Sequence, residues 1–189
     1  MSIIGKKAPA FTTKAARNGE IFDVSLDNYN GKWLVLFFYP LDFTFVCPTE
    51  LVAFSEANSK FKEVGAEILG VSVDSVHTHL AWMRTPRAEA GVGSLNYPLA
   101  QDLDKSICQA YDVMSGPVAH RGVFIIDPDG VVQSMTVNNE PVGRNVDEVL
   151  RTLYASQHVR ENGVACPANW VKGEAGMEKS LEGVKKVIG

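Results

Sequence analysis

Apolar and polar residues follow one another in blocks that predict a mixed α/β fold. Residues 33–39 are apolar throughout and are closed by Pro40, which is typical of a strand buried on both faces. Apolar residues then recur at steps of three and four, which predicts one helix that begins near Pro48 and ends at Gly65. Residues 68–73 predict the next strand. This order predicts a strand–helix–strand unit with parallel strands and a right-handed crossover.

The middle of the chain predicts two further helices and a hairpin. Residues 77–90 and 104–111 have helical patterns, the second one short. Residues 123–126 and 131–137 read as strands, and the intervening Asp-Pro-Asp-Gly at 127–130 is a strong turn signal. These two strands are therefore expected to form an antiparallel hairpin.

The last third of the chain predicts one more helix and an arm. Apolar positions within residues 146–153 predict a helix that ends at Asn162-Gly163. Residues 164–189 combine many lysines and glutamates with a weak apolar pattern, which indicates an arm that packs on something else. We expect an α/β domain with a mixed sheet over residues 1–163 and a C-terminal arm over residues 164–189.

Composition and charge narrow the class of protein. A chain of 189 residues that is 46% hydrophobic and 21% charged is typical of one soluble globular domain. No apolar run approaches the length of about 20 residues that crosses a bilayer, and residues 1–20 offer no secretory signal. The net charge is -4, with no clustered basic run. We expect a cytoplasmic protein without a membrane or nucleic-acid partner.

The chain has three cysteines, an odd number that cannot all pair in intrachain disulfides. Reactive or redox-active cysteines are therefore the leading question. Cys47 lies at the predicted start of a helix, where unpaired N–H groups and the helix dipole stabilise an anion such as a thiolate. Free cysteine is also commonly a small buried hydrophobe, so its position alone leaves both interpretations open. The hydroxyl of Thr44 can hydrogen-bond to the sulfur or to its reaction partner, which favours the reactive interpretation.

The other two cysteines are interpreted differently from each other. A thioredoxin-type disulfide exchanger carries a second cysteine three residues after the first, and this chain has Glu50 there. Any second reacting thiol must come from a distant segment. Cys166 lies in the predicted arm, a kind of segment that can unfold locally to deliver a sulfur. Cys108 lies inside a predicted short helix beside an apolar neighbour and is interpreted as structural.

A metal site is not expected, because no pair of candidate ligands has zinc-finger spacing. His77 and His79 open a predicted helix two residues apart and do not share a face. We interpret both as surface or capping residues. Arg121 is a cation at the end of a predicted strand, where an ordinary salt bridge is the alternative to a functional role.

One segment carries a family resemblance. Residues 37–50, Phe-Phe-Tyr-Pro-Leu-Asp-Phe-Thr-Phe-Val-Cys-Pro-Thr-Glu, resemble the active-site segment of the peroxiredoxins, specifically the typical 2-Cys group that includes alkyl hydroperoxide reductase C. The Pro-x-x-x-Thr-x-x-Cys spacing is highly specific. The likeness continues through residues 121–127, 141–144 and 164–170, and it covers roughly residues 3–175.

The resemblance implies a thioredoxin-like fold in which a mixed central sheet is flanked by helices. It implies Cys47 as the peroxidatic cysteine and Cys166 as the resolving cysteine. The residues that it implies for the rest of the peroxide pocket are Pro40, Thr44 and Arg121, with Glu50 and Arg144 in support. No metal, haem or flavin motif is present, so we expect a reaction that uses the protein's own sulfur without a cofactor.

The resemblance also implies the reaction. The thiolate of Cys47 attacks hydrogen peroxide or an organic hydroperoxide, and the resulting sulfenic acid condenses with Cys166 to a disulfide. Thioredoxin or a flavoprotein disulfide reductase is the expected electron donor. Family members place the resolving cysteine on the partner subunit of a homodimer, and such dimers commonly form a decamer. A thiol–disulfide exchanger and a ring-forming holdase chaperone are the alternatives.

The chain departs from the oxidation-sensitive members of this family at two places. Residues 90–93, Ala-Gly-Val-Gly, only partly match the Gly-Gly-Leu-Gly of those members, and their Tyr-Phe motif is missing near the last residues given. The resemblance therefore implies a robust enzyme, in which the resolving thiol reaches the oxidised Cys47 before a second peroxide does.

Overall fold

The computed structural model describes residues 2–189 and shows two compact units, which are described separately. The first unit ends at Val146 and the second is Asp147–Gly189. None of the helices in the described part of the chain is long and apolar enough to cross a membrane. The predicted domain boundary after residue 163 stays a prediction.

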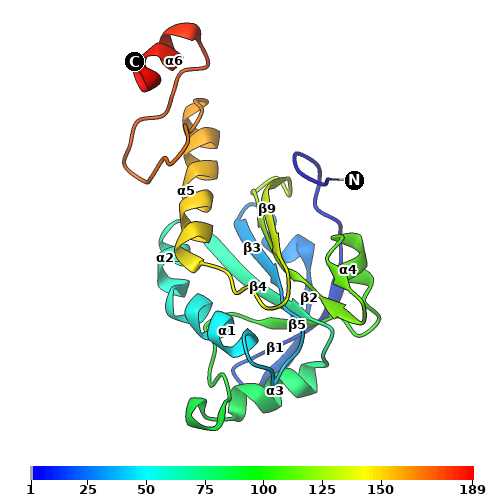
Figure 1. Cartoon of the computed structure of the whole chain (residues 1–189). Coiled ribbons are helices and arrows are strands. Elements are labelled where there is room, and N and C mark those ends of the chain that lie inside the picture. Colours follow the sequence, from blue (N-terminus) through cyan, green and yellow to red (C-terminus); the bar gives the residue numbers. More distant parts are fainter. Residues whose placement is uncertain (1) are drawn as a thin grey trace. The chain divides into compact units, whose positions relative to one another are not determined.

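Within the described residues, a seven-stranded mixed sheet forms the centre of the first unit (Figure 1). Its strand order is β2-β1-β5-β4-β3-β8-β9, in which β3, β4 and β5 pair in parallel and the other neighbours pair antiparallel. The predicted mixed α/β fold is confirmed. The strands of this sheet are β1 (Thr12–Arg17), β2 (Glu20–Ser25), β3 (Trp33–Phe38), β4 (Ala66–Ser72), β5 (Leu99–Gln101), β8 (Arg121–Ile126) and β9 (Val132–Asn138).

The predicted central strand is confirmed, because every side chain of β3 is buried and β3 lies between β4 and β8. The parallel pairing of β3 with β4 starts at Trp33 opposite Ala66. The predicted hairpin is also confirmed, with β8 and β9 antiparallel around residues 127–130. The apolar runs predicted at residues 33–39 and 68–73 are therefore the adjacent parallel strands β3 and β4, which end at the same edge of the sheet.

The helix predicted to run from Pro48 to Gly65 is divided in two. The structure has α1 (Cys47–Glu56) and α2 (Asn58–Glu63), and Ala57 between them has ψ near -5°. Asn58 is buried, and its side-chain amide donates to the carbonyl of Asn96 at 3.2 Å. This contact with a distant loop accompanies the break, and the apolar periodicity did not reveal it.

The helix predicted over residues 77–90 also ends early. Helix α3 (Val76–Arg84) stops because Pro86 disfavours the helical conformation at Thr85, whose ψ is 126°. A 3-10 turn, η2 (Arg87–Glu89), follows. The predicted short helix of residues 104–111 is present as α4 (Ser106–Ala110).

Several short elements had no sequence signal strong enough to predict them. The strand β2 is mostly exposed, so it lacks a buried apolar face. A small second sheet pairs β6 (Met114–Ser115) with β7 (Val118–Ala119), and the 3-10 turn η1 (Leu26–Tyr29) follows β2. Strands of this length carry too few residues to show an alternation.

Helix α5 (Val146–Asn162) starts at the last residue of the first unit, continues into the second unit and extends to Asn162, as predicted. Gly163 follows with φ of 67°, a left-handed conformation that ends the helix at low steric cost. Beyond it, Ala165 pairs with Met177 in an isolated bridge, and the ring of Trp170 packs at a tilt against that of His158, with ring centroids 5.0 Å apart. A further short helix, α6 (Leu181–Ile188), was not predicted.

Candidate active site

Cys47 is the first residue of α1, directly after the loop that leaves β3. Its side chain is only 1% exposed, and Pro48 occupies the first turn. The preceding residue, Val46, makes no side-chain cap, and its carbonyl accepts from the N–H groups of Thr49 and Glu50. The predicted position at a helix N-terminus is confirmed, and a negative charge on the sulfur is favoured there by the helix dipole.

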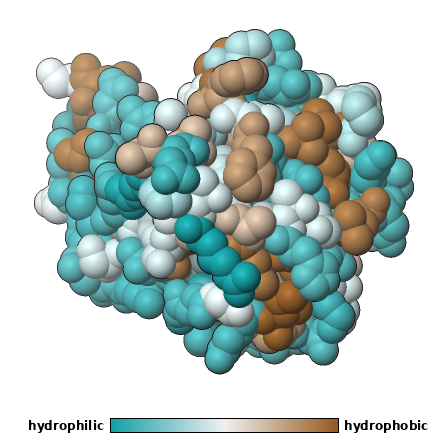
Figure 2. Space-filling view, turned by 90° about the horizontal axis from the view of Figure 1, so that it is seen from below, coloured by the Kyte–Doolittle hydropathy of each residue, from teal (hydrophilic) through white to brown (hydrophobic). Residues whose placement is uncertain are grey.

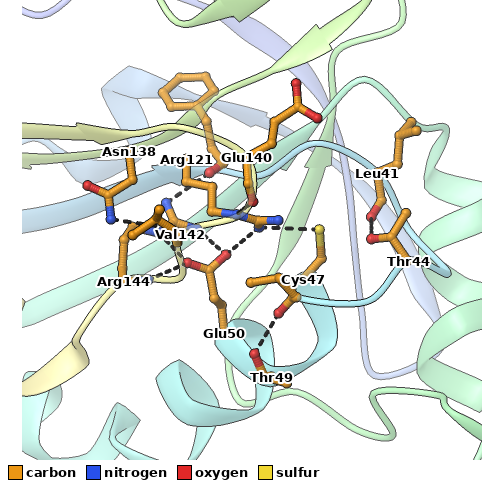
Figure 3. Close-up of polar contacts among 12 residues, drawn as sticks. Leu41, Thr44, Cys47, Thr49, Glu50, Arg121, Asn138, Glu140, Val142 and Arg144 are labelled. Carbon is orange, nitrogen blue, oxygen red and sulfur yellow. Dashed lines mark hydrogen bonds and ion pairs between the residues drawn. The ribbon is translucent and has the colours of Figure 1, made fainter.

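Arg121 places a positive charge beside this sulfur (Figure 3). Its Nη1 atom lies 3.4 Å from the Sγ of Cys47 and donates to Glu50 Oε2 at 2.7 Å. Burial alone would lower the pKa of Arg121, but the contacts with Cys47 and Glu50 raise it overall. The salt bridge that the sequence offered as the alternative role of Arg121 is present, with Glu50 as its partner. The same nitrogen, Nη1, also contacts the sulfur of Cys47.

Glu50 links two buried arginines (Figure 3). Its carboxylate accepts from the backbone N–H, Nε and Nη2 of Arg144 at 2.8–2.9 Å, in addition to Arg121. Arg144 Nη1 donates to the carbonyls of Phe38 and Gly122 on the two neighbouring strands. Burial raises the pKa of Glu50, but Arg144 and then Arg121 outweigh it and hold the pKa below its ordinary value. The carboxylate therefore stays ionised and fixes both guanidinium groups.

Thr44 directs its hydroxyl proton away from the sulfur. Its Oγ1 donates to the carbonyl of Leu41 at 2.9 Å (Figure 3). A hydroxyl that donates in this way keeps its lone pairs for an incoming donor. Thr44 is therefore placed to accept a hydrogen bond from the O–H of a substrate rather than to donate one to Cys47.

A cavity of ≈ 600 Å³ is lined by Pro40, Thr44, Cys47 and Arg121 together. These are the four residues that the sequence resemblance implies for the pocket, Cys47 among them. Sequence reasoning did not single out the rest of the lining, which comes partly from the motif segment itself and partly from the short elements around residues 115–118 and 140–141. The remaining lining residues are Leu41, Phe45, Val46, Ser115, Pro117, Val118, Glu140 and Pro141.

Apolar side chains are also exposed next to this cavity. Phe45 lines it and is 94% exposed, and the neighbouring Phe43 is 53% exposed. Figure 2 shows that apolar residues on the face seen from below gather in patches between hydrophilic ones. The cavity thus combines a charged floor at Arg121 with a largely apolar wall.

The other two cysteines lie in contrasting surroundings. Cys108 in α4 is fully buried, and burial followed by the nearby Asp102 raises the pKa of its thiol. Cys166 is partly exposed in the second unit, and its Sγ lies 3.6 Å from the carbonyl of Ala155. Burial raises the pKa of Cys166 while the positive charge of Arg151 works in the opposite direction. Of the two, Cys166 is the more accessible thiol.

The interpretation of His79 as a surface or capping residue is wrong. His79 is fully buried, and its Nδ1 lies 2.7 Å from Asp42 Oδ2, whereas His77 is exposed as expected. The cap of α3 is Ser75, whose hydroxyl accepts from Thr78. A pattern of two histidines two residues apart does not show which one faces the core.

No cluster of three or more metal-ligating side chains occurs in the part of the chain that the structure describes.

A thiol at a helix N-terminus, held beside a buried arginine in a cavity on a thioredoxin-like fold, defines a thiol-based peroxidase. The chain belongs to the peroxiredoxins of the AhpC/TSA family, whose sequence profile matches residues 4–135. A second profile, the C-terminal domain of 1-Cys peroxiredoxin, matches residues 155–189.

Individual relatives support this membership. Peroxiredoxin-2 of Mus musculus is 51% identical over 185 residues, which cover 97% of this chain and 93% of the relative. The chloroplastic 2-Cys peroxiredoxin BAS1 of Hordeum vulgare is 49% identical and covers 98% and 90%. Among solved structures, the reduced 2-Cys peroxiredoxin of Plasmodium vivax superposes with a TM-score of 0.96 at 44% identity, covering 99% of this chain and 98% of that chain. Enterococcus faecalis AhpC has a TM-score of 0.83 at 36% identity, with 88% and 100% covered.

Proposed function

We propose that Cys47 carries out the thiol-dependent peroxidase reaction of this enzyme, with Arg121, Thr44 and Pro40 completing the substrate site. The observation that carries this assignment is the 3.4 Å approach of Arg121 Nη1 to the Cys47 sulfur inside a cavity of ≈ 600 Å³. A guanidinium N–H forms a stronger hydrogen bond with a charged acceptor than with a neutral one, so this contact favours sulfur chemistry that passes through a thiolate. Family membership supports the peroxidase activity itself.

The reaction begins when the thiolate of Cys47 attacks the terminal oxygen of the hydroperoxide. A sulfur–oxygen bond forms as the O–O bond breaks, which leaves a sulfenic acid on Cys47. The departing oxygen takes up a proton and leaves as water or an alcohol. Arg121 is placed to stabilise the charge that develops during this transfer, because its Nη1 faces the sulfur.

Ionisation alone gives too small an acceleration. A free thiol with a pKa of about 8.5 is a few per cent thiolate at pH 7, so complete ionisation raises the reactive fraction by no more than about thirtyfold. Alignment of the peroxide must supply the rest. Thr44 supports this alignment, because its hydroxyl proton is engaged by Leu41 and its oxygen is free to accept from the peroxide.

The wall of the cavity supports organic hydroperoxides as substrates in addition to hydrogen peroxide. Leu41, Phe45, Pro117, Val118 and Pro141 give the cavity that Cys47 lines an apolar surface. An alkyl group that leaves water for such a wall gains about 0.8 kcal/mol per buried methylene. The enzyme is therefore proposed to accept both substrate classes at one site.

Resolution is proposed to use Cys166. Its thiol condenses with the sulfenic acid of Cys47, releases water and forms a disulfide between the two sulfurs. We propose that the two cysteines come from different subunits of a homodimer, and that dimers assemble into a decamer. The names of the relatives support this scheme, since several are 2-Cys peroxiredoxins.

The electron donor completes the cycle. We propose thioredoxin or a flavoprotein disulfide reductase, either of which reduces the disulfide by thiol–disulfide exchange. A cytoplasmic location belongs to the same proposal and rests on the cysteine usage, which favours a reducing compartment.

Peroxide consumption by the purified protein tests the proposal, with thioredoxin and a flavoprotein reductase supplied side by side. We expect turnover with at least one donor, and we expect Cys47→Ser to abolish it while Cys108→Ser retains it. Protection of unfolded clients by both variants without any peroxide turnover in the wild type would instead support the holdase alternative. Reduction of protein disulfides without peroxide turnover would support the exchanger.

A further inference from the structure

A buried polar cluster lies beneath the loop that connects β3 to Cys47, and the reaction described above does not use it. The cluster consists of Tyr39, Asp42, Asp74 and His79 and is called the Asp42 cluster below. Tyr39 and His79 are fully buried, and the side chain of Asp42 has no exposed surface. Buried ionisable groups need a compensating arrangement, because an unpaired buried carboxylate is costly.

Asp42 is at the centre of this arrangement. Its Oδ1 accepts from the Tyr39 hydroxyl at 2.7 Å, and its Oδ2 faces His79 Nδ1 at 2.7 Å. Its backbone N–H donates to Asp74 Oδ2 at 2.7 Å. Burial, followed by the charge of Asp42, raises the pKa of Tyr39, so the phenol keeps its proton and donates it. Every polar group that Asp42 presents to the cluster has a partner.

The partners of Asp42 come from three separate parts of the core. Tyr39 directly follows β3, Asp74 follows β4, and His79 lies on α3. The other ring nitrogen of His79, Nε2, lies 3.3 Å from the carbonyl of Ala100 on β5. Asp42 therefore ties the loop of residues 40–46 to the residues that follow β3 and β4 and to α3, and His79 extends this contact to β5.

The residue after Asp42 shows why such a tie is needed. Phe43 has φ of 52°, in the left-handed region that a bulky side chain rarely adopts. A strained conformation persists only where its surroundings over-determine it. Phe43 is 53% exposed in the single chain, and its ring lies 5.6 Å from that of Trp82.

The turn at Phe43 sets the position of the next residue, Thr44. Thr44 and Leu41 both line the cavity, and the hydroxyl of Thr44 donates to the Leu41 carbonyl across this turn. Cys47 follows three residues later at the start of α1. The Asp42 cluster thus lies at the base of the segment that carries the substrate contact and the nucleophile.

We propose that Asp42 is a positioning residue for peroxide reduction, held by Tyr39 and His79 so that the strained turn keeps Thr44 aligned with the sulfur of Cys47. This inference rests on the proposed role of Cys47. It assigns to three buried side chains outside the cavity a share in the rate of the chemical step.

The test compares two reactions of the same sulfur. Reaction with hydrogen peroxide needs the aligned pocket, whereas alkylation by iodoacetamide needs only an accessible thiolate. Both rates are measured at Cys47 by peptide mass spectrometry, the first in competition with a reference peroxidase. The variants are Asp42→Asn, which keeps the shape but cannot accept from both partners, and Tyr39→Phe, which removes a single hydroxyl.

Asp102→Asn is the matched control. Asp102 is also a buried carboxylate, 2% exposed, and its two oxygens accept from the N–H groups of Ile107 and Cys108 at 3.0 and 2.8 Å. Its loss removes comparable hydrogen bonds from another part of the fold. Any effect on stability alone is therefore shared by the control, and only a positioning effect is specific to the Asp42 cluster.

We expect Asp42→Asn to slow the peroxide reaction by about tenfold to a hundredfold, and Tyr39→Phe to slow it less, while alkylation of Cys47 is not slowed. Asp102→Asn should leave both rates unchanged. Peroxide rates of both cluster variants within about twofold of the control overturn the inference. So does the failure of both variants to fold, because the cluster then serves the core rather than the loop. A wild-type protein inert to peroxide overturns the proposed function instead.

Discussion

Arg121 holds its Nη1 atom 3.4 Å from the sulfur of Cys47, although the two residues lie on different elements of the fold. The contact forms because β3 and β8 are adjacent strands, and α1 begins where the chain has left β3. Glu50, one turn along α1, accepts a hydrogen bond from the same nitrogen and holds the guanidinium group in place. The pairing of two strands therefore brings the cation, its carboxylate partner and the sulfur together.

Replacement of Arg121 tests whether this contact aligns the peroxide or only ionises the sulfur. Arg121→Ala should slow peroxide reduction by about a hundredfold or more, since a lost donor at a developing charge costs about 3 to 4 kcal/mol. The rate and the thiolate titration are measured in the same variant, the latter by ultraviolet absorbance. Arg87→Ala, which removes an exposed partner of Glu56, is the control and should change neither. A loss of rate that the altered thiolate fraction fully explains would refute alignment.

Single-turnover and multiple-turnover measurements should assign a different role to each of the three cysteines. Cys166→Ser should oxidise once at Cys47 and then recycle poorly with a protein dithiol, because no resolving thiol remains. Cys108→Ser should retain both steps, since its thiol is buried and its pKa is raised. Stopped-flow oxidation and coupled turnover measure the two steps. Loss of recycling in Cys108→Ser would show that the resolving role belongs to Cys108.

Glu50 should contribute stability that depends on pH. Its pKa in the folded protein is below the ordinary value of 4.5, so its contribution is present above pH 4.5 and is lost as the pH falls below that value. Glu50→Gln should lower the free energy of unfolding at pH 7 by about 3 to 5 kcal/mol, because two buried guanidinium groups lose their partner. The difference from wild type should shrink in acid.

Denaturant unfolding of wild type and Glu50→Gln at several pH values measures this effect. Glu56→Gln is the control, because Glu56 forms a solvent-exposed ion pair with Arg87. Such pairs contribute about 1 kcal/mol or less to the free energy of unfolding. A difference between wild type and Glu50→Gln that stays constant from pH 7 to acid would contradict an ionised Glu50 in the native state.

Two substitutions in the loop at residues 90–93 should change the stability of the protein in opposite directions. Ala90 has φ of 61°, a left-handed conformation that costs an alanine about 1 to 2 kcal/mol, so Ala90→Gly should raise the free energy of unfolding by about 1 kcal/mol. A Cβ at Gly91 would lie 1.9 Å from the carbonyl oxygen of Thr85, so Gly91→Ala should destabilise the protein. Thermal unfolding measures both. Destabilisation by Ala90→Gly would show that the left-handed turn is not the determining feature.

The local segments with strong apolar patterns were predictable from the sequence, and the tertiary polar contacts were not. The buried strand β3, the hairpin of β8 and β9 and the last residue of α5 follow from apolar runs, a turn signal and a glycine. The helix breaks at Ala57 and Thr85 lie beyond such patterns, and only Pro86 gave a local sign of the second.

The site shows the same division. The family resemblance singled out Cys47, Thr44 and Arg121, and the structure brings all three to one cavity. The burial of His79 against Asp42 could not be predicted, because it depends on how α3 packs beneath a loop that is distant in sequence. Side chains whose role arises from such packing carry no periodicity or spacing of their own.

The central claim is that peroxide oxidises the sulfur of Cys47 and no other. The most direct measurement treats the Cys166→Ser protein with one equivalent of hydrogen peroxide, traps the product with dimedone and locates the adduct by mass spectrometry. The account predicts an adduct on Cys47, with Cys108 unmodified. An adduct on Cys108 in a correctly folded sample, with Cys47 still a free thiol, would contradict it.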